Sequence, residues 1–112
     1  MVTNGKVDWT EQFKIRPRNN ASLKHEVIKT ILVRRLINIY KEKKNLNMIR
    51  IYTEYPIRNS KNERKICDVY FENLKTKERV CYEIQKKITP EWLEKTKDFY
   101  NKILDIFFWN SF

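Results

Sequence analysis

Two short apolar runs, each interrupted by one acidic residue, constrain the fold of this chain more than any other feature. Residues 65–72 read KICDVYFE, residues 79–87 read RVCYEIQKK, and the polar stretch NLKTKE joins them. Runs this rich in β-branched and aromatic residues predict strands, and the polar connection predicts an antiparallel hairpin. Asp68 interrupts the first run and Glu83 the second. Because an unpaired carboxylate is costly in a buried strand, each acid needs a specific partner.

The two acids are placed to meet across this hairpin. If the turn is centred between residues 75 and 76, Asp68 falls opposite Glu83, and directly opposed side chains are ~5 Å apart. Carboxylates this close repel unless a cation lies between them, and oxygen ligands suit Mg²⁺ or Mn²⁺ rather than zinc. The alternative is that each acid pairs with a nearby Lys or Arg. Strict alternation of strand faces also predicts that Cys67 and Cys81 point to opposite faces, which argues against a disulfide between them.

The remaining patterns add two helices and two strands around the hairpin. Ser22 precedes a three- and four-residue apolar periodicity that predicts a long amphipathic helix. Residues 48–57 alternate as a strand does, Thr89 and Pro90 begin a second helix, and residues 103–109 predict a last strand. The expected apolar positions of the first helix are Leu23, Val27, Ile28, Ile31, Leu32, Leu36, Ile39 and Tyr40.

The order α-β-β-β-α-β predicts a single α/β domain with a mixed four-stranded sheet flanked by helices. A right-handed crossover through the second helix places the last strand parallel to a neighbour. We divide the chain into an N-terminal basic arm or docking segment at 1–20 and this domain at 21–112.

Positive charge is concentrated in one part of the chain. The sequence has 24 Lys and Arg against 14 Asp and Glu, a formal charge of +10, and 11 of the basic but only 2 of the acidic residues lie within 14–50. Such an excess favours an anionic partner, with nucleic acid first, although a solvated helix face is the simpler interpretation. The sequence has no long apolar run and no signal-peptide pattern, so we expect a cytoplasmic (intracellular) protein with no membrane partner.

These acids, in this order of elements, resemble the PD-(D/E)xK nuclease superfamily, most closely the CoiA-like branch of competence proteins and its small archaeal and viral relatives. The resemblance spans residue 22 to about residue 109 and implies a restriction-endonuclease-like αβββαβ core. It is carried by the segments SLKHEVIK (22–29), YTEYPI (52–57), RKICDVYF (64–71), CYEIQKK (81–87) and ITPEWLEKTKDFY (88–100).

The resemblance implies a metal site. Asp68 and Glu83, with the backbone carbonyl of Ile84, would bind Mg²⁺ or Mn²⁺. The next position of the motif is usually Lys but is Gln85 here, whose amide can orient a water without supplying a positive charge. Glu26, on the first helix, either completes the metal site or is a solvated residue paired with its helix neighbours.

Two further residues have alternative roles. Glu54 leans toward the site if it faces Asp68, and otherwise pairs with Arg50 or Arg64. His25, the only histidine, contacts phosphate or acts as an acid or base, or else has an ordinary capping or packing role.

The predicted DNA contacts are basic residues of the arm, the first helix and the end of the third strand. On a regular strand Lys87 shares the face of Glu83 but starts about 13 Å from it, so we rank phosphate contact above catalysis for Lys87. The predicted DNA-binding set is Lys14, Arg16, Arg18, His25, Lys29, Lys86 and Lys87.

Together these features predict a metal-dependent DNA endonuclease that hydrolyses phosphodiester bonds and is directed by DNA structure or context. It needs no small-molecule cofactor, and with one site per chain a homodimer would cut both strands most easily. The alternative is a catalytically inactive DNA-binding module with a nuclease-like fold, which the departure at Gln85 suggests. The predicted catalytic set is Asp68, Glu83, Gln85, Glu26 and Lys87.

Overall fold

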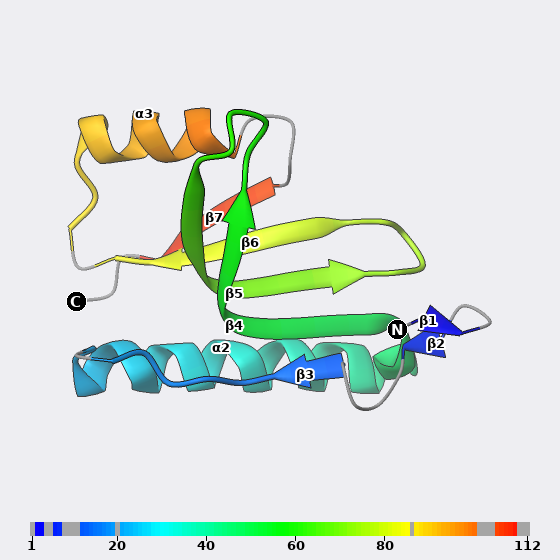
Figure 1. Ribbon diagram of the computed structural model, residues 1–112. Helices are drawn as coiled ribbons and strands as arrows, with labels where there is room; N and C mark the ends of the chain where they lie inside the picture. The colour runs from blue at the N-terminus through cyan, green and yellow to red at the C-terminus, as the bar shows by residue number, and fades with distance from the viewer. Residues whose placement is uncertain are drawn as a thin grey trace.

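The chain folds around a sheet whose strands follow the spatial order β3-β4-β5-β6-β7 (Figure 1). The computed structural model describes residues 12–19, 21–85 and 87–100, together with the backbone of three short segments at 2–3, 6–7 and 105–109. The sheet strands are β3 (Phe13–Lys14), β4 (Ile49–Arg58), β5 (Arg64–Asn73), β6 (Arg79–Ile84) and β7 (Asp105–Trp109); the helices are α2 (Leu23–Glu42), the 3₁₀ turn η1 (Leu46–Met48) and α3 (Pro90–Phe99); β1 (Val2–Thr3) and β2 (Lys6–Val7) pair separately.

The sheet is mixed, as expected. Strands β4, β5 and β6 pair antiparallel in chain order, and β7 lies parallel to β6 after the α3 crossover. The α/β class and the order α-β-β-β-α-β are therefore confirmed. The sequence did not reveal β3, a short piece of the arm that pairs parallel with β4 and adds a fifth strand.

Helix α2 begins where the sequence predicts, but its buried face is different. The Ser22 hydroxyl accepts a hydrogen bond from the N–H of His25 at 3.1 Å and caps the helix. The buried stripe includes His25 and Lys29 beside Ile28 and Leu32. The predicted apolar positions spread over a wider part of the helix surface than the sheet can cover. Part of the covered surface is occupied by the polar residues His25 and Lys29. The apolar positions left exposed are Leu23, Val27, Ile31 and Ile39.

Helices α2 and α3 lie on opposite sides of the sheet (Figure 1), and an apolar core lies under each of them. The larger core contains the α2 residues Ile28, Leu32, Val33 and Leu36 with Ile49, Ile51, Val69, Phe71, Val80 and Ile84. The smaller core contains Tyr52, Ile57, Cys67, Tyr70, Cys81 and Tyr100. The sheet is therefore buried on both faces.

Strands β4 and β5 bend together at one register position. Thr53 pairs with Val69 and Tyr55 with Cys67, while Glu54 and Asp68 between them form no ladder pair. Glu54 has φ 51°, a left-handed conformation that is strained for a residue with a Cβ. Figure 1 shows both strands turning sharply along their length.

The bend corrects the prediction for the two thiols. Val69 faces the larger core but Cys67 faces the smaller core together with Cys81, so the alternation of faces slips by one residue at Asp68. The prediction of opposite faces was wrong because it assumed a regular strand. Both cysteines are buried and carry free thiols.

The third strand is shorter than predicted, whereas the second helix begins as predicted. Strand β6 ends at Ile84, and residues 87–89 are not in a strand. Helix α3 begins at Pro90, and the Thr89 hydroxyl accepts a hydrogen bond from the N–H of Trp92 at 3.1 Å. Within the described part of the chain, no helix combines the length and the apolar character needed to cross a membrane.

Candidate active site

Three carboxylates occupy neighbouring positions across three strands. The β4–β5 register places Glu54 beside Asp68, and the β5–β6 register, in which Val69 pairs with Tyr82, places Asp68 beside Glu83. The relation of Asp68 to Glu83 is the one predicted from the turn. We call Glu54, Asp68 and Glu83 the acid row, and it lies where the sheet bends.

The side chain of Asp68 takes over a backbone hydrogen bond at the end of the β5–β6 ladder. The N–H of Ile84 donates to Oδ2 of Asp68 at 2.7 Å, and the ladder pairs of these strands stop at Val69 and Tyr82. The carboxylate therefore satisfies a buried donor that would otherwise lack a partner. This bond fixes Asp68 against β6.

Glu83 is held in dry surroundings by two donors. Its side chain is 2% exposed, and its Oε1 accepts from the Tyr100 hydroxyl at 3.1 Å and the Cys81 thiol at 3.3 Å. Burial, and next the negative charge of Asp68, raise the pKa of Glu83 to about 7. Near neutral pH this carboxyl therefore exists in both protonation states.

Basic side chains surround the acid row from the arm and from α2. Nη1 of Arg18 lies 3.7 Å from Oδ1 of Asp68, and its Nε lies 3.9 Å from Oε1 of Glu54. Nζ of the buried Lys29 lies 3.4 Å from Oε2 of Glu54 and donates to the backbone carbonyl of Arg16 at 2.9 Å. Burial raises the pKa of Glu54 despite the opposing charge of Lys29. These cations offset part of the repulsion among the acids.

Glu26 is linked to the row through basic neighbours. Its Oε2 lies 2.8 Å from Nζ of Lys29 and 3.2 Å from Nδ1 of His25, and its Oε1 accepts from the N–H of Arg18 at 2.9 Å. Burial acts to raise the pKa of Glu26, but these hydrogen bonds outweigh it and lower the pKa. Glu26 therefore pairs with its helix neighbours Lys29 and His25, which was one of the two predicted alternatives. The same contacts connect Glu26 to the acid row, because Lys29 also contacts Glu54.

His25 bridges Glu26 and the acid row. Its Nε2 lies 3.6 Å from Oδ1 of Asp68 and is buried without a hydrogen-bond partner. His25 and Lys29 are 6% and 4% exposed, so in this arrangement both face the acids rather than the surface that a DNA backbone would meet.

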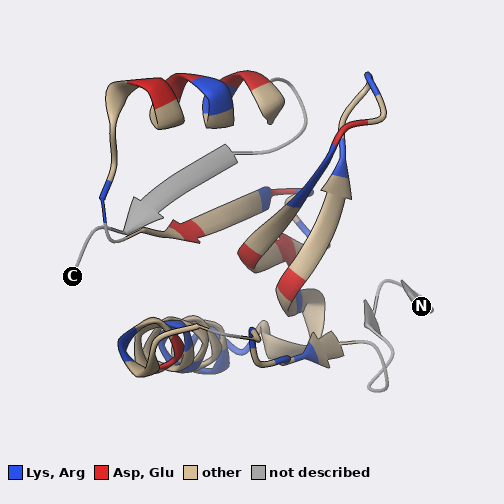
Figure 2. Cartoon of the chain, turned by 60° about the vertical axis from the view of Figure 1, so that its left-hand side comes forward, with Lys and Arg blue, Asp and Glu red and all other residues tan. Residues whose placement is uncertain are grey.

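The acid row opens into a cleft of about 620 Å³ between the arm, the bent strands and α3. Pro17, Arg18 and Asn19 form one wall. Lys65, Ile66, Gln85 and Trp92 also line the cleft, together with Glu54, Asp68 and Glu83. Figure 2, in which α2 is seen almost end-on, shows basic residues around that helix and acidic bands on the strands above it.

The donor chemistry of the cleft suits a hard divalent cation, because Asp68, Glu83 and Glu54 offer carboxylate oxygens. Among the described residues, however, no three His, Cys, Asp or Glu side chains are close enough together to hold an ion as they stand. The oxygens that would turn toward a cation are instead engaged by Arg18, Lys29, Tyr100 and the Ile84 N–H. A metal ion would have to replace at least the Arg18 contacts.

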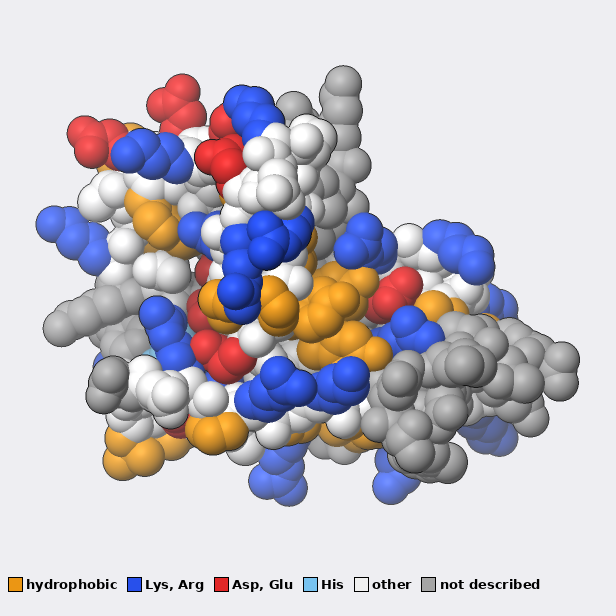
Figure 3. Space-filling view, viewed as in Figure 1, with side chains coloured by type: hydrophobic (Ala, Val, Ile, Leu, Met, Phe, Trp, Pro, Cys, Tyr) orange, Lys and Arg blue, Asp and Glu red, His pale blue; other side chains and the backbone are white. Residues whose placement is uncertain are grey.

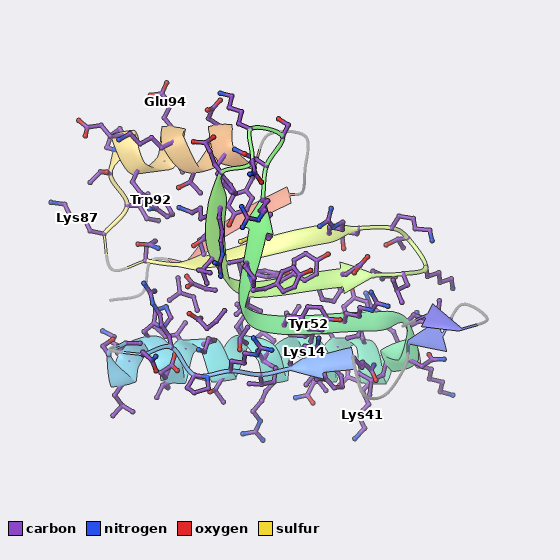
Figure 4. The ribbon with its side chains drawn as sticks, in the orientation of Figure 1. Lys14, Lys41, Tyr52, Lys87, Trp92 and Glu94 are labelled. Atoms are coloured by element: carbon purple, nitrogen blue, oxygen red, sulfur yellow. The ribbon has the colours of Figure 1, made fainter. Side chains whose placement is uncertain are left out.

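The other residues predicted for catalysis lie at different places. Gln85 lines the cleft, one residue beyond the end of β6. Lys87 is exposed, and Figure 4 shows it projecting outward, away from the sheet. The shared face expected for Lys87 and Glu83 depended on a strand continuing through residue 87, so this part of the prediction was wrong. Lys86 lies outside the described residues.

The predicted DNA-contact residues of the arm lie at the surface. Lys14, Arg16 and Arg18 are exposed, and Nζ of Lys14 lies 5.4 Å from the centre of the Tyr52 ring. In Figure 3, Lys and Arg side chains are spread over the arm and α2, while acidic side chains gather on α3. Arg18 therefore belongs both to the exposed basic residues of the arm and to the lining of the cleft.

Sequence reasoning missed three residues of this site. Tyr100, Trp92 and Lys65 were not among the predicted site residues. The available signal was the eight-residue spacing of Trp92 and Tyr100, which places both on one broad face of a helix.

Comparison with known proteins gave no match: no family model fits the chain, and no curated protein or solved structure is detectably similar to it.

Proposed function

We propose that this protein is a Mg²⁺- or Mn²⁺-dependent DNA endonuclease of the PD-(D/E)xK type. The observation that carries the proposal is the acid row, because Asp68 and Glu83 lie side by side in one cleft next to a basic arm. The order of elements around the row is the order that the resemblance implies. Buried carboxylates that repel each other are costly to stability, which favours a functional reason for their presence.

The residues of the cleft divide into metal-holding and substrate-holding groups. Asp68 and Glu83 would hold the metal with the backbone carbonyl of Ile84, and Glu54 is the nearest additional carboxylate. A bound divalent metal polarises a phosphate oxygen and lowers the pKa of a water. Gln85 lines the same cleft and would orient that water through its amide.

The basic residues would bind and position the DNA backbone. Lys14 and Arg16 extend the binding surface beyond the cleft, and Arg18 reaches from this surface to the acids. Such contacts give strong salt dependence and little base recognition, so cutting would follow the shape of the DNA. His25, Lys29 and Glu26 would position the acids from α2.

Cleavage assays test the proposal directly. Labelled linear, single-stranded, branched and supercoiled DNA is incubated with Mg²⁺ or Mn²⁺ at low salt, with wild-type protein, Asp68→Asn and Glu83→Gln. Both substitutions keep the side-chain volume and remove a charge. We expect metal-dependent cutting by the wild type and a loss of at least a hundredfold in both variants. Cutting that persists in both would exclude the acid row as the catalytic site.

A DNA-binding module without catalysis is the second candidate. Two observations favour it: Gln85 stands where the superfamily usually has Lys, and Arg18 and Lys29 already neutralise part of the acid row. Tight, salt-sensitive binding of all the DNA substrates with no cutting in either metal would support this candidate.

We also propose that the active form is a homodimer. One chain carries one acid row, and cutting both strands of a duplex requires two such sites with opposite polarity. Light scattering with and without DNA measures the mass of the complex, and a monomer under both conditions contradicts the dimer.

A further inference from the structure

The cleft has an aromatic wall that the nuclease chemistry does not use. Of the described residues that line the cleft, one is aromatic, and it is Trp92. The Thr89 cap and Pro90 fix the first turn of α3, and Trp92 lies in this turn. Figure 4 shows the indole on the sheet side of α3, while Glu94 projects from the opposite side. The ring is only partly buried.

A second cavity adjoins the first at this residue. It has a volume of about 510 Å³ and shares Lys65 and Trp92 with the cleft of the acid row. Its remaining walls are Glu63, Arg64, Lys95, Thr96, Asp98 and Phe99. A nucleic-acid strand that left the acid row on this side would pass the indole before reaching Arg64 and Lys95.

Lys65 supplies a cation over the ring. Its Nζ lies 5.4 Å from the centre of the Trp92 ring and 3.5 Å from the Thr96 hydroxyl. Its positive charge also acts to lower the pKa of Glu83, so it lies within electrostatic range of the acid row. The Lys65 ammonium therefore lies over the Trp92 ring, and both side chains line the cleft of the acid row.

From this geometry we propose that Trp92 and Lys65 form a subsite for an unpaired nucleobase and its phosphate, beside the acid row. Bases within a duplex stack on each other and cannot lie on a ring inside a cleft, whereas an unpaired base can stack on an indole. The substrate class is accordingly DNA with a single-stranded segment next to the bond that is cut. This inference rests on the proposed nuclease function and specifies the class of DNA that the nuclease would cut.

Binding measurements test the subsite separately from catalysis. A forked duplex with two unpaired arms and a fully paired duplex of the same length are titrated without divalent metal, using fluorescence anisotropy. The variants are Trp92→Ala, Trp92→Phe, Lys65→Gln and, as an outward-facing control on α3, Glu94→Ala. The thermal midpoint of each variant verifies that it is folded.

We expect the wild type to prefer the fork, and Trp92→Ala to weaken fork binding about tenfold, since loss of one base–aromatic stack costs roughly that factor. Binding of the paired duplex should change less than twofold. Trp92→Phe should retain most of the preference, Lys65→Gln should lose part of it, and Glu94→Ala should resemble the wild type. A 2-aminopurine at the first unpaired position should be quenched by the wild type and not by Trp92→Ala.

Equal binding of fork and duplex by the wild type, or equal losses on both in Trp92→Ala, would overturn the subsite. Cleavage with Mg²⁺ then separates the two proposals. Cutting that requires Asp68 but ignores unpaired bases leaves the nuclease proposal standing and removes the subsite. Fork preference that depends on Trp92, without cutting in either metal, supports the subsite and contradicts catalysis.

Discussion

The hydroxyl of Tyr100, at the end of α3, donates a hydrogen bond to Oε1 of Glu83 at 3.1 Å. This bond links α3 to the acid row through the smaller core, in which Tyr100 is 1% exposed. Because the acceptor is a buried carboxyl with a raised pKa, the contact has a consequence for stability that depends on pH.

Glu83→Gln should stabilise the metal-free protein at pH 8 much more than at pH 5. The pKa of Glu83 is raised from 4.5 to about 7, so the folded protein keeps a proton that the unfolded chain releases. Stability from this group is present below about pH 4.5 and is lost as the pH rises toward 7. Gln retains a hydrogen-bond acceptor but has no charge to bury. At about 1.4 kcal/mol per pKa unit, the gain at pH 8 relative to pH 5 is on the order of 2 kcal/mol, because the unfolded carboxyl is already mostly ionised at pH 5.

Urea unfolding of both proteins in EDTA at the two pH values measures this difference. A stability difference that is the same at pH 5 and pH 8 would contradict the raised pKa. Asp68→Asn serves as a comparison, because it removes the neighbouring charge and should bring the pKa of Glu83 down.

Glu54→Gly should be more stable than Glu54→Ala by about 1 kcal/mol, because Gly adopts a positive φ without the strain of a Cβ. Glu54 has φ 51°. Both variants lose the same contact with Lys29, so the comparison isolates the backbone term. The measurement is the free energy of unfolding at one pH, and a more stable Glu54→Ala would show that the bend does not need the left-handed conformation.

Arg18→Ala should increase the affinity for Mn²⁺ in the absence of DNA. The Arg18 guanidinium lies beside Asp68 and Glu54, where a divalent cation would be held. It is 52% exposed, and exposed ion pairs are weak, so we expect a gain of about two- to tenfold. Calorimetric titration of the wild type, Arg18→Ala and the neighbouring Arg16→Ala measures it. If Arg16→Ala gains as much, the effect is one of overall charge rather than of the Arg18 contacts.

Removal of Lys14 and Arg16 should reduce the salt dependence of DNA binding. Each lost phosphate contact lowers the slope of log K against log salt by about 0.9, so the double alanine variant should lose roughly 2 from the slope. The matched control is Lys41→Ala with Lys43→Ala, at the far end of α2, where Figure 4 shows Lys41 projecting away from the sheet. Equal losses in both double variants would mean that DNA covers the whole of α2.

The parts of this fold that follow local rules could be predicted from the sequence. Ser22 and Thr89 cap helices because their hydroxyls satisfy free backbone donors, and the hairpin register follows from the distance of Asp68 and Glu83 from the turn. These features depend on a few neighbouring residues, so a single sequence contains the information.

The bend could not be predicted in this way. Glu54 adopts a left-handed conformation at the point where β4 and β5 bend between the two cores, and a glutamate does not itself signal a positive φ. The same bend places Cys67 in the smaller core together with Cys81. The hydrogen bond from the Ile84 N–H to Asp68 lies at the end of β6. The predicted face of Cys67 was wrong because it was extrapolated along a regular strand across this bend. The predicted face of Lys87 was wrong for another reason, because β6 ends at Ile84.

The bend also sets limits on how this protein can be improved. Substitution of a residue with a strained backbone, such as Glu54, or of a buried carboxyl, such as Glu83, is an easy way to increase protein stability. Here both belong to one row of three acids. Laboratory selection for heat resistance alone would therefore tend to erase the acid row first, and an evolved variant that tolerates heat would need to be examined for what it can no longer do.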